Sequence, residues 1–290
     1  MIIFKKIMNL SKMKKLVALL LIMGIIGMVS CKSKKEESKE TSSTPMEMEV
    51  NINGQEVQYS SDSTNLKGYI AFNENLNEKR PGVIIIHEWW GHNNYVRQRA
   101  DMLAELGYTA IAVDMYGEGK VAEHPDDAGK FAMSVMSNLP EAEARFNAAM
   151  RLLKSHPSVD NEKIAAIGYC FGGSVALTMA NSGADLDVVA AFHSGVQLPV
   201  MPNERLKARV LVCNGADDPF ISPESVTAFK SAMDSIGANY NYIAYPGVKH
   251  SFTSKEADAN GKKFNMPLAY DAEADKNSWT SLLQLFEESF

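Results

Sequence analysis

Basic residues are not in excess in this sequence, and they form no stripe. The 290 residues include 29 Lys and Arg against 35 Asp and Glu, so the formal net charge is −6. Proteins that bind nucleic acid gather Lys and Arg on one face, and none of their motifs occurs here. Binding to DNA or RNA is therefore not expected. Internal repeats are absent as well, and the length suits one large domain.

A hydrophobic run long enough to span a bilayer is also lacking. The apolar run of residues 16–29 is too short for a comfortable span, and it follows five lysines and precedes Ser30 and Cys31. A basic segment, a short apolar segment and a small residue before the cleavage point are typical of a secretory signal peptide. We place this signal peptide at residues 1–30.

The segment Met28-Val29-Ser30-Cys31 resembles the bacterial lipobox, in which the cysteine is lipidated and becomes the mature N-terminus. We expect the protein to be exported. We also expect acyl chains on Cys31 to anchor it to the membrane of the bacterial cell envelope, on the periplasmic or surface face. Plain secretion is the alternative. Residues 32–45 contain no aliphatic or aromatic side chain, so residues 31–45 are predicted to be a disordered tether. The folded domain is then residues 46–290.

Cysteine is scarce, since the chain beyond Cys31 has only Cys170 and Cys213. Two cysteines in an exported protein can form a disulfide. Cys213, however, closes the apolar segment 210–212, which favours burial as a small hydrophobic residue. A disulfide is therefore the less favoured alternative.

Apolar segments of strand length alternate with helical patterns through most of the domain. Strands are predicted at 66–72, 83–86, 109–113, 164–167, 188–192, 210–213 and 240–245, and helices at 95–106, 140–154, 174–180, 222–236 and 279–290. Partial alternation at 46–50 and the turn dipeptide Asn53-Gly54 indicate an antiparallel hairpin at the start. This order predicts an α/β fold, a mostly parallel central sheet with helices on both faces. Ligands bind beyond the carboxyl ends of such strands.

One of these strand ends leads through Gly168-Tyr169-Cys170-Phe171-Gly172-Gly173 into a helix. A strand, a tight turn and a helix with a nucleophile at the apex form a nucleophile elbow. A Cβ at Gly168 or Gly172 would collide where the strand and the helix pass each other. The helix N-terminus at the apex favours a thiolate. The alternative is that Cys170 is a small buried residue in a glycine-rich turn.

A cysteine nucleophile needs a base, and the chain has six histidines. His87 and His193 lie at strand ends, where a structural role is equally possible. Only His250 follows both the cysteine and an acid at the end of strand 210–213, which is the order nucleophile, acid, histidine of α/β-hydrolases. Two acids compete for the middle place. We predict Asp217, the first after the turn, over Asp218, which precedes a proline and suits a turn or cap.

Five segments, taken in order, resemble the dienelactone hydrolase family of α/β-hydrolases. They are HEWWG at 87–91, VDMYG at 113–117, GYCFGG at 168–173, the G-x-D turn at 215–217 and KHSF at 249–252. The resemblance covers nearly all of residues 50–290. It implies the α/β-hydrolase fold and a triad of Cys170, His250 and Asp217.

The resemblance also implies that Glu88 holds the resting thiol by a hydrogen bond until substrate displaces it. An oxyanion hole needs the backbone N–H of the residue after the nucleophile, Phe171, and a second N–H from the loop after the first parallel strand. The family pattern assigns that second N–H to Trp89.

In the family pattern, arginines bind the substrate carboxylate, and this sequence departs from that pattern. Four residues after the histidine stands Ser254, followed by Lys255, which lacks the bidentate fork of arginine. Dienelactone itself is therefore not the expected substrate. The side chains expected to line the substrate pocket are Trp90, Tyr116, Phe252 and Lys255.

Together these features imply a hydrolase that cleaves a small ester or lactone through an acyl-thioester intermediate, without a metal or an organic cofactor. Two alternatives are a carboxylesterase or thioesterase for larger acyl groups, and a non-catalytic envelope protein that binds a ligand on the same fold. The expected partners are a small-molecule substrate and the membrane, and the expected state is a monomer.

Overall fold

The computed structural model describes residues 50–62 and 64–290, and residues 48–290 group into one compact unit. The predicted signal peptide, the lipidation site Cys31, the tether and nearly all of the predicted strand 46–50 lie outside the described residues. In the described part of the chain, no helix combines the length and the apolar character needed to cross a membrane.

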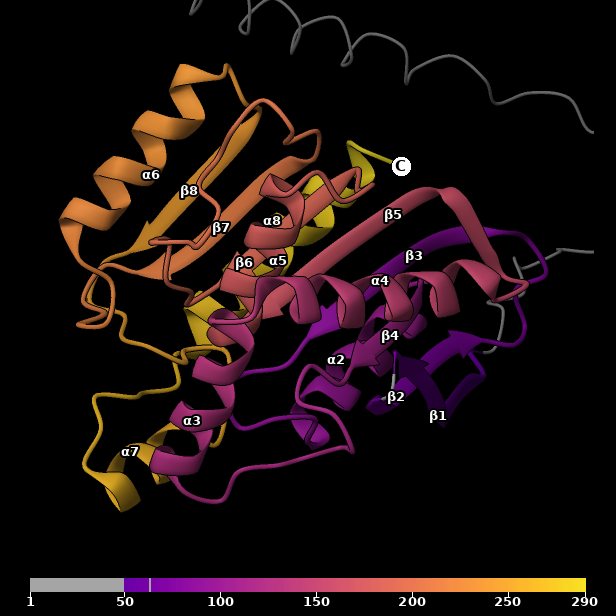
Figure 1. Ribbon diagram of the computed structural model, residues 1–290, viewed down its shortest axis with the longest axis horizontal. Coiled ribbons are helices and arrows are strands. Elements are labelled where there is room, and N and C mark those ends of the chain that lie inside the picture. Colours follow the sequence, from indigo (N-terminus) through magenta and orange to yellow (C-terminus); the bar gives the residue numbers. More distant parts are fainter. Residues whose placement is uncertain (1–49, 63) are drawn as a thin grey trace, which may run out of the picture. The chain divides into compact units, whose positions relative to one another are not determined.

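The centre of the unit is an eight-stranded sheet in the order β1-β2-β4-β3-β5-β6-β7-β8 (Figure 1). The strands are β1 Ile52–Ser61, β2 Thr64–Asn73, β3 Arg80–Ile86, β4 Thr109–Val113, β5 Val159–Tyr169, β6 Val188–Phe192, β7 Arg209–Gly215 and β8 Tyr240–Tyr245. β2 runs antiparallel to β1 and β4, and all other neighbouring strands are parallel. This arrangement confirms the predicted fold class, including the antiparallel pair at the N-terminal edge.

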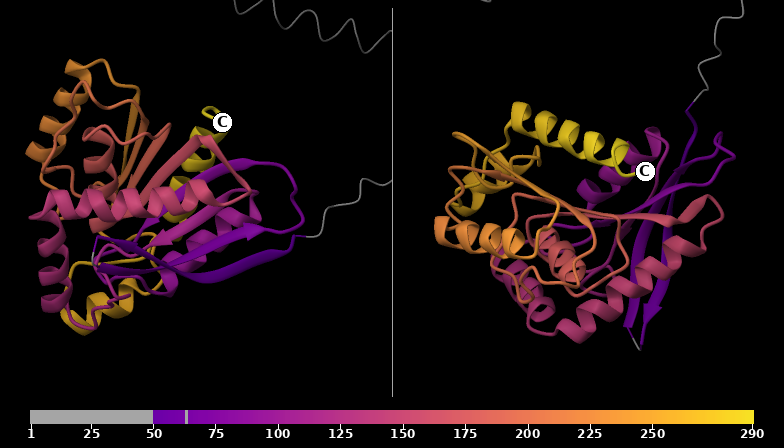
Figure 2. Two further views of the ribbon diagram at one scale, coloured as in Figure 1. Left: turned by 45° about the vertical axis from the view of Figure 1, so that its right-hand side comes forward. Right: turned by 90° about the horizontal axis from the view of Figure 1, so that it is seen from above.

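Helices cover both faces of the sheet (Figure 2). α2 (Asn94–Glu105) and α8 (Ala272–Glu287) pack on one face, and α4 (Leu139–Ser155), α5 (Phe171–Asn181) and α6 (Pro223–Ser235) pack on the other. Successive residues of the central strands enter opposite cores, so that Ile84 and Ile86 join the core under α4 and α5, and Ile85 joins the core under α2. Strands buried on both faces read as unbroken apolar runs, which explains why they were predictable.

Two further helices were not predicted, α3 (Pro125–Met136) after β4 and α7 (Ala257–Phe264) after β8. α3 begins at a histidine cap, because the ring of His124 accepts a hydrogen bond from the backbone N–H of Asp126. The two helices lie together in Figure 1, and the ring centroids of His124 and Phe264 are 5.4 Å apart. Both helices follow carboxyl ends of strands, so they stand at the edge of the sheet where ligands bind.

The predicted hairpin turn at Asn53-Gly54 is wrong. Both residues lie inside β1, paired with Phe72 and Ala71, and the turn to β2 comes after Ser61. A Cβ on Gly54 would lie 1.8 Å from the hydroxyl oxygen of Tyr69. Gly54 is therefore required because the side chain of Tyr69 crosses over β1 at this position. It does not mark a turn.

Cys213 is fully buried at the end of β7, as predicted for a small hydrophobic residue, and it and Cys170 are both free thiols. Burial raises the pKa of the Cys213 thiol to about 12, so that it stays protonated and inert. Cys170 is half-buried and accessible.

Candidate active site

Cys170 forms the apex of a sharp turn between β5 and α5. Its φ of 54° and ψ of −118° are values that residues other than glycine rarely adopt. A Cβ on Gly168 would lie 2.1 Å from the carbonyl oxygen of Gly172, and a Cβ on Gly172 would lie 2.3 Å from that of Ile86. The predicted steric need for both glycines is thereby confirmed. Close contact between β5, β3 and the start of α5 raises the thiol above the edge of the sheet.

His250, in the loop after β8, meets the thiol. Its Nε2 lies 3.1 Å from Sγ of Cys170, and its Nδ1 lies 2.7 Å from Oδ2 of Asp218. Cys170 and His250 are 80 positions apart in the chain, and the carboxyl edge of the sheet brings them into contact.

The contact with Asp218 corrects the prediction of Asp217. The turn after β7 is fixed by hydrogen bonds from the backbone N–H groups of Ala216 and Asp217 to Tyr245 and Val248. In this turn the side chain of Asp217 is exposed, whereas that of Asp218 points inward and is 4% exposed. The other oxygen of Asp218 accepts the backbone N–H of Phe220 at 2.9 Å, so the turn role expected for Asp218 and the contact with the histidine belong to the same carboxylate.

The electrostatics of the site favour a charged His250. Burial lowers its pKa, but the charge of Cys170 and the hydrogen bonds to Asp218 and Cys170 outweigh burial and raise the pKa to about 10. The imidazole therefore carries a second proton at neutral pH, between two groups that stabilise its positive charge.

Glu88, in the loop after β3, does not make the predicted hydrogen bond to the thiol. Its Oε1 accepts the hydroxyl of Ser251 at 3.2 Å, while the thiol faces His250. The carboxyl is 4% exposed, and burial raises its pKa to about 7 against the lowering effects of His250, Ser251 and Arg99. A carboxyl that titrates near neutral pH thus stands beside the histidine loop.

Trp89 and Phe171 line the cavity beside Cys170, and their backbone N–H groups have no acceptor among the described residues. Phe171 is the first residue of α5, where N–H groups have no partner within the helix. These are the two donors that the sequence assigned to the oxyanion hole, and their freedom suits that use.

Hydrogen bonds from the side chains of Tyr116 and His87 hold the loop that bears Trp89. The hydroxyl of Tyr116 donates to the carbonyl of Trp89 at 2.9 Å. Nε2 of His87 accepts the backbone N–H of Met115, so its Nδ1 carries the proton and donates to the carbonyl of Glu88 at 2.6 Å. Burial lowers the pKa of His87 to about 4, which keeps the ring neutral. His87 is therefore a structural residue, one of the two roles considered for it.

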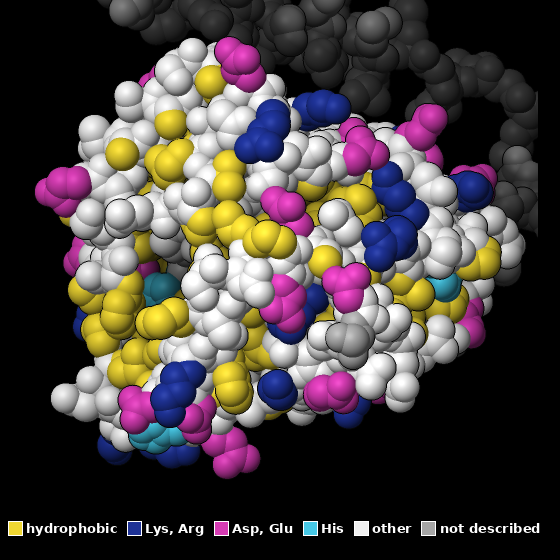
Figure 3. Space-filling model, in the orientation of Figure 1, with side chains coloured by type: hydrophobic (Ala, Val, Ile, Leu, Met, Phe, Trp, Pro, Cys, Tyr) yellow, Lys and Arg dark blue, Asp and Glu magenta, His cyan; other side chains and the backbone are white. Residues whose placement is uncertain are grey.

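A cavity of about 270 Å³ opens beside the thiol. Its walls are almost entirely apolar, and they are formed by Trp89, Ala132, Cys170, Phe171, Ser174, Gly195, Phe220, His250, Met266 and Leu268. Hydrophobic side chains gather on this side of the molecule, above α3 and α7 (Figure 3). Of the described residues that form the wall, only His250 and Cys170 have titratable side chains.

The four side chains predicted to line this pocket lie elsewhere. Phe252 is fully buried in the core, and Tyr116 packs behind Phe171 with a ring-centroid distance of 5.4 Å. Trp90 packs on Phe264, and Lys255 borders a different cavity beside Arg99. Sequence reasoning missed six pocket residues, which come from five separate segments of the chain: Ala132, Ser174, Gly195, Phe220, Met266 and Leu268.

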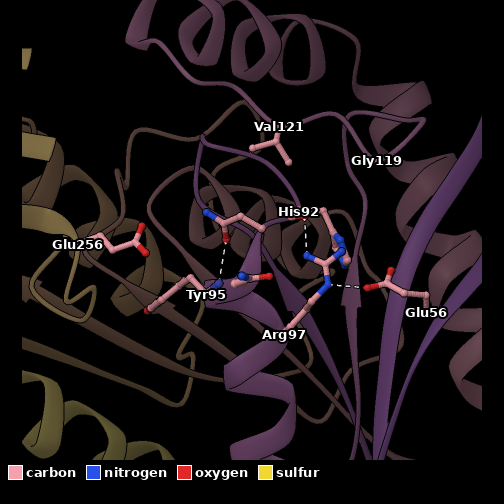
Figure 4. A pocket seen from close by; sticks show the side chains of 9 residues that line it. Glu56, His92, Tyr95, Arg97, Gly119, Val121 and Glu256 are labelled. Carbon is pink, nitrogen blue, oxygen red and sulfur yellow. Dashed lines mark hydrogen bonds and ion pairs between the residues drawn. The ribbon is translucent and has the colours of Figure 1, made fainter.

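A larger cavity, of about 640 Å³, lies between β1 and the start of α2 (Figure 4). Arg97 crosses it, with Nε 2.6 Å from a carboxylate oxygen of Glu56 and Nη1 donating to the carbonyl of His92. Neither Cys170 nor His250 lines this cavity. Its size does not make it the reaction site, because the contact between the thiol and the histidine lies outside it.

A nucleophile elbow at the carboxyl edge of a mostly parallel sheet, followed along the chain by an acid and a histidine, defines the α/β-hydrolase class. Residues 66–290 match the model of the dienelactone hydrolase family, and the chain belongs to that family. It is accordingly a hydrolase that acts on ester bonds.

Several known proteins are similar to this chain over most of its length. The solved structure of m3DLH is 35% identical, with a TM-score of 0.78, and covers 82% of this chain and 99% of its own. A dienelactone hydrolase-like promiscuous phosphotriesterase from metagenomic libraries is 33% identical, with a TM-score of 0.77 and the same coverage. Protein usf of Aquifex pyrophilus is 28% identical over 240 residues, which is 81% of this chain and 98% of that protein. A protein of Aquifex aeolicus named "Putative carboxymethylenebutenolidase" is 26% identical over 210 residues, 71% of this chain and 89% of that protein.

Proposed function

We propose that the chain hydrolyses a small, neutral carboxylic ester or lactone with Cys170 as the nucleophile. The observation that carries the proposal is the 3.1 Å contact between Sγ of Cys170 and Nε2 of a histidine whose pKa is raised to about 10. A thiolate beside an imidazolium is the form in which cysteine attacks a carbonyl.

The reaction takes two steps. Sγ attacks the carbonyl carbon, the N–H groups of Phe171 and Trp89 hold the oxyanion, and the alcohol leaves with the proton from Nε2 of His250. The acyl thioester is then attacked by water, from which Nε2 takes a proton, and the acid is released with the thiolate restored. Asp218 keeps the ring of His250 oriented and stabilises its positive charge, without taking the proton itself.

The pocket supports a neutral substrate. Among residues 50–62 and 64–290, no Lys or Arg lines the cavity beside the thiol, so an anionic group would lose hydration there without gaining a partner. The volume of about 270 Å³ lies below the range of about 300–1,000 Å³ typical of drug-sized ligands, which favours a small ester over a long acyl chain.

A neutral phosphotriester is a second candidate substrate. The relative with phosphotriesterase activity is 33% identical over 99% of its length, and the apolar pocket suits a neutral phosphoryl group as well as a neutral carbonyl. Sγ would displace one alcohol at phosphorus, and water would then release the phosphodiester.

The test uses p-nitrophenyl acetate and a pair of lactones that differ only in a carboxylate. We expect hydrolysis that iodoacetamide and Cys170→Ala both abolish, with thermal stability nearly unchanged in the variant, and a higher kcat/KM for the neutral lactone. Full activity in Cys170→Ala would show that the nucleophile is misassigned. Binding without any turnover would favour the non-catalytic alternative, and diethyl p-nitrophenyl phosphate tests the second candidate.

We also propose that the mature chain is a lipoprotein of the bacterial envelope, anchored through Cys31. The proposal rests on the sequence Met28-Val29-Ser30-Cys31 after an apolar run. Metabolic labelling with palmitate should mark the full chain and leave the Cys31→Ala variant unlabelled. A parent chain that takes up no label and appears in the soluble fraction would indicate plain secretion instead.

A further inference from the structure

We infer that Thr253 and His193 are positioning residues for His250, and that they act through a buried chain of polar side chains ending at Arg99. The inference rests on the proposed function, because it concerns the same pair of histidine and cysteine. It extends that function to side chains that do not line the pocket beside Cys170.

The ring of His250 is bounded on two sides. The ring of Phe220 stands edge-on at a centroid distance of 5.1 Å, and that of His193 at 5.3 Å. Phe220 is 52% exposed, whereas His193 is fully buried. The contacts with Asp218 and Cys170 fix the two ring nitrogens, and the flanking rings limit the tilt of the imidazole. Of these two rings only that of His193 is buried, so it is the more rigid support.

His193 is itself held by several contacts. Its backbone N–H donates to the carbonyl of Cys213 at 2.8 Å, and its Nε2 lies 2.7 Å from Oγ1 of Thr253. The ring packs against Phe252 at a centroid distance of 5.3 Å. Burial, reinforced by the positive charges of His250 and Arg99, keeps the pKa of His193 well below its ordinary value. A neutral ring therefore faces the charged His250 without repelling it.

Thr253 connects this histidine to two helices. Its Oγ1 lies 2.6 Å from the hydroxyl of Tyr95, which accepts a hydrogen bond from Nε of Arg99 at 3.3 Å. Nη2 of Arg99 donates to the carbonyl of Thr253 at 2.9 Å and to Asp275 at 2.7 Å. Tyr95 and Arg99 belong to α2 and Asp275 to α8, so the loop of His250 is tied to the helices on one face of the sheet.

Backbone strain at the same place supports a functional reading. Cys170, His193 and Ser251 have φ values of 54°, 39° and 60°, and all three lie in segments that converge on the thiol. Such conformations persist only where surrounding contacts hold them. The hydroxyl of Thr253 supplies one of these contacts, and without it Nε2 of His193 and the hydroxyl of Tyr95 lose their shared partner.

The experiment compares Thr253→Val, which keeps the shape and removes the hydroxyl, with Thr253→Ser, which keeps the hydroxyl. The readout is the rate at which iodoacetamide alkylates Cys170, followed on its peptide by mass spectrometry across pH, together with kcat and KM for p-nitrophenyl acetate. Thr109→Val is the matched control, because Thr109 is also fully buried and pairs with a hydroxyl, that of Ser158, at 2.6 Å. It stands at the start of β4, at the opposite edge of the sheet from the thiol.

We expect Thr253→Val to lower the alkylation rate at neutral pH and kcat by about tenfold or more, since small displacements of a catalytic group are costly, while KM changes little. The pH profile of alkylation should differ from that of the parent in Thr253→Val and match it in Thr253→Ser. Thr253→Ser should restore most of the rate, and Thr109→Val should react as the parent does. None of the three variants replaces a charged or titratable group around the pair; these groups are Asp218, Glu88, His87, His193, Arg99 and Tyr116.

A Thr253→Val variant whose profile and kcat match the parent would overturn the inference, provided that His250→Ala lowers the reactivity of Cys170. If His250→Ala leaves that reactivity unchanged, the proposed function fails first, and the inference falls with it. The two failures are thereby distinguished.

Discussion

Asp217 and Asp218 are chemically identical neighbours, but only the carboxylate of Asp218 lies against His250, at 2.7 Å. Asp218→Asn keeps the shape and removes the charge that stabilises the imidazolium. We expect kcat to fall by on the order of 1,000-fold or more, since the corresponding change in a serine protease costs about 10,000-fold. Asp217→Asn, the matched control on an exposed side chain, should keep the parent rate.

The measurement is kcat for p-nitrophenyl acetate in both variants. Equal losses in the two would mean that the turn after β7 is sensitive to any change, and a loss confined to Asp217→Asn would reverse the assignment. The sequence could bring the choice down to these two residues. It could not go further, because the side that each faces is set by hydrogen bonds from the turn to Tyr245 and Val248, which are remote in sequence.

The sequence likewise does not show which side chains face the substrate pocket. The sequence predicts that aromatic residues near the motifs form the pocket walls, yet Phe252 lies in the core and the hydroxyl of Tyr116 donates to the carbonyl of Trp89. Aromatic side chains serve packing and binding equally well, so their type does not reveal their role. Which of them faces a ligand depends on how the loops fold over one another.

At the scale of elements, the elbow depends on how closely β5 and α5 approach. Gly168→Ala would place a Cβ 2.1 Å from a backbone carbonyl oxygen, which cannot move without shifting α5. We expect a loss of about 3 kcal/mol or more in the free energy of unfolding, at the upper end of overpacking effects. Gly129→Ala in α3 is the control, because a Cβ there meets nothing within 4 Å and should stabilise the helix by about 1 kcal/mol.

Urea denaturation of both variants gives these two energies. If Gly168→Ala unfolds with the same free energy as the parent, β5 and α5 have room to separate. Their close approach would then not explain the strained backbone conformation of Cys170.

The elements that could be predicted are the ones whose local pattern and tertiary role agree. The central strands are buried on both faces, so their apolar runs were unambiguous, and β3 to β8 appear where expected. The sequence analysis did not predict α3 and α7, each of which buries only two residues in the fold, Ala128 and Val135 in α3 and Ala257 and Gly261 in α7. Asn53-Gly54 misled for a different reason, since the space occupied by Tyr69 accounts for the glycine and no local signal shows that.

For the molecule as a whole, Glu88 links stability to pH. Its pKa rises to about 7 in the fold, from an unfolded value of 4.5, chiefly because it is buried. Between these values the folded chain binds a proton that the unfolded chain releases, so the free energy of unfolding falls as the pH rises through this range. The total fall is about 3 kcal/mol.

Glu88→Gln mimics the protonated carboxyl and removes this titration. We expect the variant to be nearly as stable as the parent at about pH 5 and about 3 kcal/mol more stable at about pH 8. The contribution of His250 runs in the same direction but at higher pH, because a raised histidine pKa stabilises the fold at low pH and this stabilisation is lost as the pH rises from 6.5 towards about 10. The titration of His250 is common to both proteins and cancels when their free energies of unfolding are compared. Urea titrations at the two pH values measure these energies. A constant difference between the curves would contradict the assignment to Glu88.

The sheet carries the reacting groups, whereas α3 and the segment after α7 form part of the pocket wall. This separation affects how such an enzyme can change its substrate. The reacting groups stand on strand ends locked into the core, whereas Ala132 on α3 and Met266 and Leu268 beyond α7 form the outer wall of the pocket. Side-chain substitutions at these three positions change the wall of the pocket without changing the strands of the sheet. Natural selection could therefore exchange one substrate for another there while inheriting the same chemistry unchanged.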